Sequence, residues 1–305
     1  MFENRIPDLL KRRDSSRNLS GSFQRRRFLE LCGLGAASAF YPQISSAAKG
    51  DASAIEIAVD VVIIGGGLGG CAAALAAARM GKRVLLTEPT DWIGGQLSQQ
   101  GVPPDEHSNI ETFGCTASYR QFRENVRDFY RRNYPLTDAA KRDPRLNPGN
   151  GSVSRLCHEP RVAVAVLEAM LAPFVSSGRL TVLLNTQPVR ADVDGDRVLS
   201  LTLATASGHE LQAVAPYFID ASEQGDLLPL TKTEFVTGAE SQKDTGEAHA
   251  PDLAAPENIQ SFTWCFAIDH IDGADHTIEK PDQYDFWKDH TPNLTPVSYT
   301  HLRAH

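Results

Sequence analysis

The stretch that decides the fold reads Val59-Asp60-Val61-Val62-Ile63-Ile64-Gly65-Gly66-Gly67-Leu68-Gly69-Gly70, followed by Cys71-Ala72-Ala73-Ala74-Leu75-Ala76-Ala77-Ala78-Arg79-Met80-Gly81. The β-branched run over 59–64 predicts a strand buried on both faces of a parallel sheet. The alanine-rich run over 71–80 predicts a helix, and Gly81 is placed to end it. A strand, a glycine turn and a helix therefore follow one another in the order of a dinucleotide-binding βαβ unit.

The glycines of this turn have the spacing Gly65-x-Gly67-x-x-Gly70. In a dinucleotide-binding fold the first permits a tight turn, the second lets the backbone approach a pyrophosphate, and the third lets the helix pack closely. The N-terminus of the helix adds partial positive charge that attracts phosphate. We therefore predict that the cofactor-binding residues include Gly65, Gly66, Gly67, Gly69 and Gly70.

A second predicted strand, over 83–87, ends at Glu88. Its distance from the glycine turn is close to the roughly 20 residues at which a carboxylate meets the ribose hydroxyls of a dinucleotide. Such a carboxylate argues against the 2′-phosphate of NADP, but it suits FAD and NAD equally. We predict that Glu88 binds the cofactor.

The glycine doublet Gly94-Gly95, soon after the second strand, favours FAD over NAD. Flavoproteins of the glutathione-reductase type bring a loop against the diphosphate and flavin at this place, whereas an NAD dehydrogenase more usually continues into another helix and strand. We predict that both glycines bind FAD. The following loop is rich in Gly, Pro and polar residues, so we also predict that Gln96 and Ser98 reach the cofactor.

Several short strands are predicted in the second half of the chain, over 180–185, 188–193, 197–203, 210–214 and 217–222. Asp194-Gly195-Asp196 is a hairpin signal between two of them. This succession is similar to the β-meander and returning strand that interrupt the FAD-binding domain in the glutathione-reductase superfamily. The alternative is an unrelated antiparallel insertion.

Three further segments carry a more specific resemblance. They are Gly94-Gly95-Gln96-Leu97-Ser98 with Gly101-Val102-Pro103-Pro104-Asp105-Glu106, Ser154-Arg155-Leu156-Cys157-His158-Glu159-Pro160-Arg161, and Asp220-Ala221-Ser222-Glu223-Gln224-Gly225-Asp226-Leu227-Leu228-Pro229-Leu230. Together they resemble the bacterial FAD-dependent oxidoreductase family over roughly 58–296. The resemblance implies FAD and a redox role, and it implies no particular substrate. We add Val189 and Asp226 to the predicted cofactor-binding residues, although an acid such as Asp226 is also common at a helix start.

The predicted fold class is α/β, with a Rossmann-like FAD-binding domain, a parallel sheet, a β-meander and an incomplete substrate domain. We expect a signal peptide over 1–48, FAD-binding segments over 58–108 and 152–235, a helical insertion over 109–151, the start of a substrate domain over 236–296, and a foreign tail over 297–305.

The first residues resemble a twin-arginine export signal. Arg25-Arg26-Arg27-Phe28-Leu29 precedes an uncharged stretch, and Ser46-Ala47-Ala48 offers small residues for cleavage. The apolar part is too short to remain as a membrane-spanning anchor. We expect the twin-arginine machinery as a partner, a periplasmic or otherwise exported product, and no stable membrane anchor. A disordered basic tail is the alternative.

Composition narrows the function further. Of 305 residues, 38 are acidic and 30 basic, which gives a net charge of −8, and the basic residues are over-represented in the first 30 positions. The remaining acidic surface repels nucleic acid, so no nucleic-acid partner is expected. The five cysteines form no Cys-x-x-Cys pair, so no metal site is expected. Their disulfide state and the oligomeric state of the protein stay open.

His158 is the candidate catalytic residue, because histidine exchanges protons near neutral pH. The alternative is a structural contact where Pro160 opens a helix over 161–171. The basic and aromatic residues of 119–132 could meet an anionic substrate, but a solvated helix face is the commoner outcome.

The tail over 297–305 matches the translation of a sequencing-library transposon adapter. We expect that the natural protein continues beyond Pro296 and that the part closing over the flavin is missing here. The predicted function is electron or hydride transfer between FAD and an unknown small molecule. The alternatives are an NAD-dependent dehydrogenase and a non-catalytic dinucleotide-binding protein.

Overall fold

The computed structural model describes residues 55–259 and 270–290. The chain divides between Cys265 and Phe266 into two compact units, so 55–259 belong to the first unit and 270–290 to the second. This division lies after the boundary at 236 that the sequence predicts. The predicted signal peptide and the predicted foreign tail lie outside the described residues.

The described elements of the first unit are, in chain order, β1 (Ile55–Ala58), β2 (Val61–Ile64), α2 (Leu68–Arg79), β3 (Val84–Thr87), the 3-10 helix η2 (Gly95–Leu97), α3 (Ala117–Asn133), α4 (Asp138–Arg142), α5 (Pro160–Ser176), β4 (Leu180–Leu183), β5 (Thr186–Asp194), β6 (Arg197–Thr205), β7 (Glu210–Val214), β8 (Tyr217–Asp220), α6 (Leu227–Thr231) and α7 (Gln242–Thr245). The second unit contains α8 (Tyr284–Asp289). Within the described ranges, every helix is too short or too polar to span a bilayer.

A parallel sheet forms the centre of the first unit, with the strand order β4-β3-β2-β8. All four residues of β2 are buried, as a strand covered on both faces requires. Val61 and Ile63 belong to one apolar core, and Val62 and Ile64 belong to another. This alternation confirms the α/β fold class and the central strand predicted from the β-branched run.

A second sheet, with the order β1-β7-β6-β5, contains the predicted β-meander. Strands β5, β6 and β7 pair antiparallel, and Gly195 lies in the hairpin between β5 and β6 with a φ of +56°. Strand β1 pairs with β7 in parallel and ends at Ala58, and β2 begins only at Val61. The predicted continuous strand over 59–64 is therefore wrong at Val59 and Asp60. The chain changes sheets at Asp60, whose side chain accepts a hydrogen bond from the Arg83 amide at 2.7 Å.

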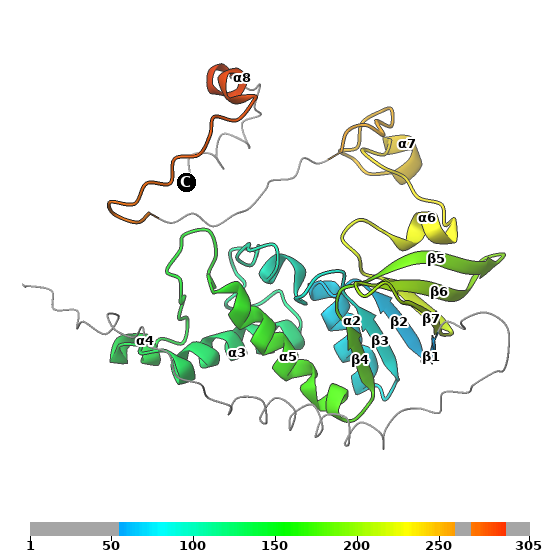
Figure 1. Ribbon diagram of the computed structural model, residues 1–305, viewed down its shortest axis with the longest axis horizontal. Coiled ribbons are helices and arrows are strands. Elements are labelled where there is room, and N and C mark those ends of the chain that lie inside the picture. Colours follow the sequence, from blue (N-terminus) through cyan, green and yellow to red (C-terminus); the bar gives the residue numbers. More distant parts are fainter. Residues whose placement is uncertain (1–54, 260–269, 291–305) are drawn as a thin grey trace, which may run out of the picture. The chain divides into compact units, whose positions relative to one another are not determined.

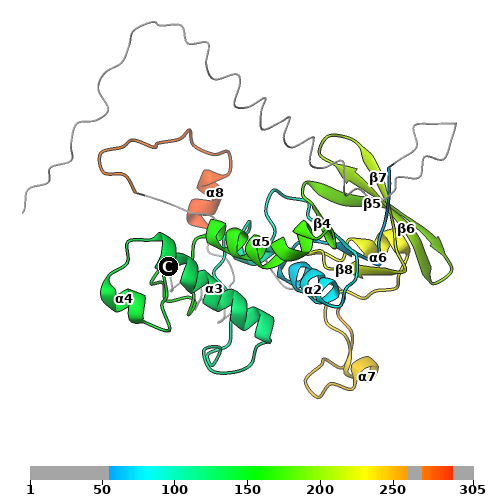
Figure 2. The ribbon, with the colours of Figure 1, turned by 90° about the horizontal axis from the view of Figure 1, so that it is seen from below.

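The first unit therefore has three layers, which Figures 1 and 2 show from two sides. Helices α2 and α5 pack on one face of the parallel sheet, α3 packs against α5, and the second sheet covers the other face. The predicted helical insertion contributes directly to the first core, because Phe122, Val126 and Tyr130 of α3 are buried in it. The predicted insertion therefore shares one apolar core with the parallel sheet.

The basic face of α3 corrects one expectation. Arg123 and Arg127 are buried, with 0% and 4% of their surface exposed, so this part of the helix is not a solvated face. Both guanidinium groups have carboxylate partners outside the helix, and these partners make their burial tolerable.

Candidate cofactor site

Three strand ends bring the predicted site residues to one edge of the parallel sheet. Gly65 follows β2, Glu88 follows β3 and Ala221 follows β8. These strands are parallel neighbours, so their carboxyl ends share an edge. The amide of Ala221 donates to the carbonyl of Ile64 at 2.7 Å, which continues the pairing up to the glycine turn.

Close backbone approaches require glycine at two positions of this turn. Gly65 has a φ of +99°, and a Cβ placed on it would lie 2.3 Å from the backbone oxygen of Ala221. A Cβ on Gly70 would lie only 1.9 Å from the carbonyl oxygen of Gly65. Gly69 differs, because a Cβ there meets nothing within 4 Å among the described residues. The turn is therefore packed tightly against β8 and α2 and open beside Gly69.

The start of α2 is suited to an anion. Gly67 is the N-cap residue and supplies no side-chain cap, and the first turn contains no acidic residue. The first amides of a helix have no acceptor within it, and the helix dipole makes this end electropositive. A diphosphate can accept these hydrogen bonds.

The second glycine turn lies directly against the first. The amide of Gly94 donates to the carbonyl of Gly66 at 2.8 Å, and a Cβ on Gly95 would lie 3.1 Å from the Cα of Gly67. Gly94 has a φ of +112°. We call Gly65–Gly67 and Gly94–Gly95 together the glycine cradle.

Glu88 is held beside the cradle by three hydrogen bonds. Its Oε2 accepts from the Gly66 amide at 3.0 Å, and its Oε1 accepts from the amide and hydroxyl of Thr90 at 2.9 and 2.7 Å. The residue is 4% exposed. Its carboxylate is thereby fixed at the strand end, with acceptor capacity left for a ribose hydroxyl. Thr90 was not predicted, although a hydroxyl two residues after the carboxylate is a visible sequence signal.

The side chains of Gln96 and Ser98 turn inward. Ser98 is 1% exposed and its hydroxyl donates to the carbonyl of Ile93 at 2.6 Å. The amide of Gln96 donates to the carbonyl of Pro103 at 3.5 Å. Both side chains therefore stabilise the loop, and a contact of either with FAD stays a prediction.

Val189 and Asp226 lie away from these contacts. Val189 is exposed at an irregularity in β5, where the pairing with β6 shifts register. Asp226 occupies the N-cap position of α6, and its backbone amide donates to the hydroxyl of Ser222 at 2.8 Å. No described contact joins either residue to the glycine cradle, so their role toward FAD also stays a prediction.

Glu223 also lies at the cradle; in the sequence it follows a strand end, as Asp226 does, but only Asp226 was chosen as a cofactor-binding residue. Its Oε1 lies 3.1 Å from the position of a Cβ on Gly67 and 2.8 Å from that of a Cβ on Gly95. The available signal was its place just after a strand end, but adjacency of β8 to β2 is needed to bring it to the cradle.

His158 lies where the start of α5 meets α3. Its Nδ1 is 3.0 Å from the carbonyl oxygen of Leu156, and its ring meets Phe122 edge-on at 6.2 Å. Its Nε2 is buried and has no hydrogen-bond partner among the described residues. Burial lowers the pKa of His158, although backbone carbonyls and the carboxylate of Glu106 oppose this shift. The imidazole is therefore neutral at pH 7.

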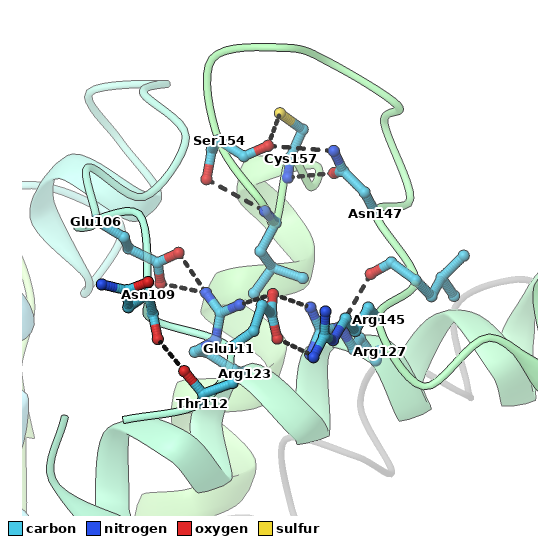
Figure 3. Close-up of polar contacts among 12 residues, drawn as sticks. Glu106, Asn109, Glu111, Thr112, Arg123, Arg127, Arg145, Asn147, Ser154 and Cys157 are labelled. Atoms are coloured by element: carbon cyan, nitrogen blue, oxygen red, sulfur yellow. Dashed lines mark hydrogen bonds and ion pairs between the residues drawn. The ribbon is translucent and has the colours of Figure 1, made fainter. Parts of the chain in front are cut away.

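A buried ion cluster ties the loop before α3 to that helix (Figure 3). Arg123 contacts both Glu106 and Glu111, and Arg127 contacts Glu111 at 2.6 Å. The hydroxyl of Tyr119 donates to Glu106 at 2.5 Å. Burial raises the pKa of Glu111, but the hydrogen bond and charge of Arg127 and the charge of Arg123 outweigh it, so the net shift is downward. The cluster joins two acidic side chains with two basic ones, so its formal charges balance.

A largely apolar cavity of about 310 Å³ lies between α2, α3 and α5. Its polar lining consists of Thr116, Ser118 and Tyr119. Each is already engaged, because Thr116 caps α3, Ser118 accepts from Arg79, and Tyr119 donates to Glu106. The cavity can take an apolar group but lacks the free polar groups of a specific substrate site.

The residues present fit FAD. The glycine cradle presents bare backbone at an uncapped helix start that is open beside Gly69, and Glu88 is placed for a ribose. Cys71 lies beneath the cradle, where its thiol donates to the carbonyl of Gly66 at 3.3 Å, and burial raises its pKa to about 12. It therefore stays a thiol and adds no charge. Within the described ranges, no three His, Cys, Asp or Glu side chains gather as a metal site.

Several solved structures are similar to the chain at low identity. The THI4 protein of Thermovibrio ammonificans is 18% identical, with a TM-score of 0.36, over 79% of this chain and 86% of that one. The FAD-dependent halogenase CndH, which is myxobacterial, is 18% identical, with a TM-score of 0.35, over 54% of this chain and 37% of that one. L-proline dehydrogenase from P. horikoshii is 16% identical, with a TM-score of 0.30, over 54% of this chain and 22% of that one. The chain thus spans less than half the length of the halogenase and of the proline dehydrogenase.

No curated protein matches the sequence. The family model described as FAD dependent oxidoreductase matches residues 60–303, which is most of the chain. Its range runs into the tail for which the sequence predicts a foreign origin, and that origin stays a prediction. The match confirms FAD as the cofactor and identifies no substrate. The chain therefore belongs to the FAD dependent oxidoreductase family.

Proposed function

We propose that the chain forms the cofactor-binding part of an exported enzyme that moves electrons or a hydride between FAD and a small molecule. The observation that carries this proposal is the glycine cradle, where two glycine turns meet at the uncapped start of α2 beside Glu88. When bound, FAD supplies the electron transfer through its isoalloxazine ring. The chain supplies binding, orientation and proton transfer.

The cradle residues have separate tasks in this proposal. The start of α2 holds the diphosphate by backbone amides and the helix dipole. Glu88 accepts from a ribose hydroxyl while Gly66 and Thr90 fix its carboxylate. The inward hydrogen bonds of Gln96 and Ser98 keep the following loop in place against the first turn.

The visible spectrum of the protein tests the cofactor assignment directly. The full chain, purified after cytoplasmic expression, should carry bound flavin or bind added FAD, and small-molecule electron donors supplied without oxygen should bleach it. Failure to bind FAD even after reconstitution would refute the assignment. A bound flavin that no donor or acceptor perturbs would favour a protein that holds FAD without turnover.

We propose His158 as the proton acceptor or donor for the substrate. Its neutral imidazole and unpartnered Nε2 support this role. Because the pKa is lowered from 6.5, the proton-accepting form persists at neutral pH and is lost as the pH falls through the lowered value. The change His158→Asn should remove this acidic limb from the pH profile of substrate-dependent flavin reduction. A purely structural histidine would instead lower thermal stability and leave the shape of the profile unchanged.

We also propose export through the twin-arginine route, on the basis of Arg25, Arg26 and the small residues up to Ala48. That route carries folded proteins, which suits a chain that must acquire a large cofactor before it leaves the cytoplasm. The acidic remainder of the chain also suits a protein with no nucleic-acid partner.

A further inference from the structure

We propose that the Glu223 carboxylate competes with the FAD diphosphate for the glycine cradle and so limits the affinity for the cofactor. Apart from Gly67 itself and its chain neighbours, its Oε1 is the sole heavy atom of the described residues within 4 Å of a Cβ placed on Gly67. In a dinucleotide-binding turn this space is left free by glycine so that the pyrophosphate can approach. A carboxylate oxygen therefore occupies space that a phosphate also needs. The proposal rests on FAD binding at the cradle and is independent of the role of His158.

The backbone before and after Glu223 is fixed, so the residue is held over the cradle. The carboxylate of Asp220 accepts from the amide and hydroxyl of Ser222 at 3.0 and 2.7 Å and from the amide of Leu227 at 2.9 Å. These bonds close the segment between β8 and α6. Gly65 packs against Ala221 and Ser222 immediately before Glu223, which fixes the distance from this segment to the glycine turn.

The Glu223 side chain itself is free to turn away. It is exposed, and among the described residues it takes part in no hydrogen bond or ion pair. The electropositive helix start attracts either the carboxylate or the diphosphate, because both are anions. Binding of the diphosphate therefore has to displace a charge of its own sign.

The size of the effect follows from exposure. Two charges about 4 Å apart interact weakly in water and several times more strongly near a protein surface, and salt reduces the interaction further. Because the Glu223 side chain can rotate away from the diphosphate, the repulsion between the two is weaker still. We expect that removing the charge raises the affinity for a diphosphate by roughly threefold to tenfold.

The test compares Glu223→Gln with the unchanged full chain after bound flavin is removed. Binding of FAD is followed by quenching of its fluorescence, and binding of ADP and adenosine by calorimetry. The variant should bind FAD and ADP more tightly by this factor and adenosine with unchanged affinity, since adenosine carries no phosphate. Glu223→Asp keeps the charge and should stay closer to the unchanged chain. Glu168→Gln, an exposed acid on α5, serves as the matched control.

The other outcomes overturn the proposal. Weaker FAD binding by Glu223→Gln would show that the carboxylate accepts a hydrogen bond from the cofactor. Equal gains for ADP and adenosine would show an effect unrelated to the phosphates. If neither the unchanged chain nor the variant binds FAD or ADP, the assignment of FAD to the cradle fails together with this proposal.

Discussion

Two neighbouring glycines of α2 allow a sharp test of the cradle geometry, because the same chemical change should have opposite effects on stability. Gly69 and Gly70 both lie in the first turn of the helix. A Cβ on Gly69 meets nothing within 4 Å, whereas a Cβ on Gly70 meets the Gly65 oxygen at 1.9 Å. Real Cβ contacts essentially never fall below 3.0 Å, so the backbone must move by about 1 Å to admit Gly70→Ala.

The magnitudes follow from two opposing effects. Alanine is favoured over glycine inside a helix by about 1 kcal/mol. Gly69→Ala should therefore raise the free energy of unfolding by roughly 0.5 to 1 kcal/mol. Gly70→Ala has the same gain but adds an overpacking cost of about 1 to 3 kcal/mol or more against backbone that cannot yield cheaply. The shared gain cancels, so we expect the two variants to differ by about 1 to 3 kcal/mol or more, with Gly70→Ala the less stable.

Urea unfolding of the flavin-free proteins, followed by far-ultraviolet circular dichroism, measures this difference without the stabilisation that a bound ligand adds. FAD affinity is the second readout, because a displaced Gly65 carries the cradle amides with it. Gly70→Ala should bind FAD at least about tenfold more weakly, since a displacement near 1 Å breaks hydrogen-bond geometry. Equal stability of the two variants would refute the close packing of α2 on the glycine turn.

Two further predictions concern other parts of the chain. Arg123→Met should lower the free energy of unfolding at neutral pH by about 3 to 5 kcal/mol, because it leaves the Glu106 carboxylate without its ion-pair partner while Glu111 keeps Arg127. The double variant Arg123→Met/Glu106→Gln should recover part of this loss. The control Arg132→Met, at an exposed arginine, should lower the free energy of unfolding by under about 0.5 kcal/mol. Equal losses of stability from Arg123→Met and Arg132→Met would contradict the buried cluster. Replacing Arg25 and Arg26 by Lys should trap the precursor in the cytoplasm, as immunoblots of cell fractions would show, and unchanged secretion would remove the export proposal.

The part of the fold that could be predicted from sequence is encoded locally. The run Val61-Val62-Ile63-Ile64 has no polar residue, so it identifies a strand buried on both faces without knowledge of its neighbours. The hairpin at Gly195 and the strands around it are likewise signalled by a turn residue between alternating segments. The structure extended α2 back to Leu68 and α5 forward to Ser176, because helix ends depend on packing as well as on local preference.

The features that sequence could not provide depend on distant partners. Arg123 and Arg127 appear as a solvated basic face because their acids, Glu106 and Glu111, precede the helix and carry no periodic relation to it. At the break of the predicted strand, Asp60 likewise pairs with a partner remote in sequence, the Arg83 amide just before β3. In each case the deciding contact lies across the fold.

Glu223 combines both kinds of information and explains why the cofactor site was only partly predictable. The glycines of the cradle are recognisable in the sequence because a diphosphate must approach backbone that carries no side chain. This requirement determines both the residue type and the spacing. Glu223 follows the end of β8, and it reaches the cradle because β8 pairs with β2. A local motif therefore indicates that FAD binds, whereas the charges around its phosphates, which set how tightly it binds, come from the order of the strands.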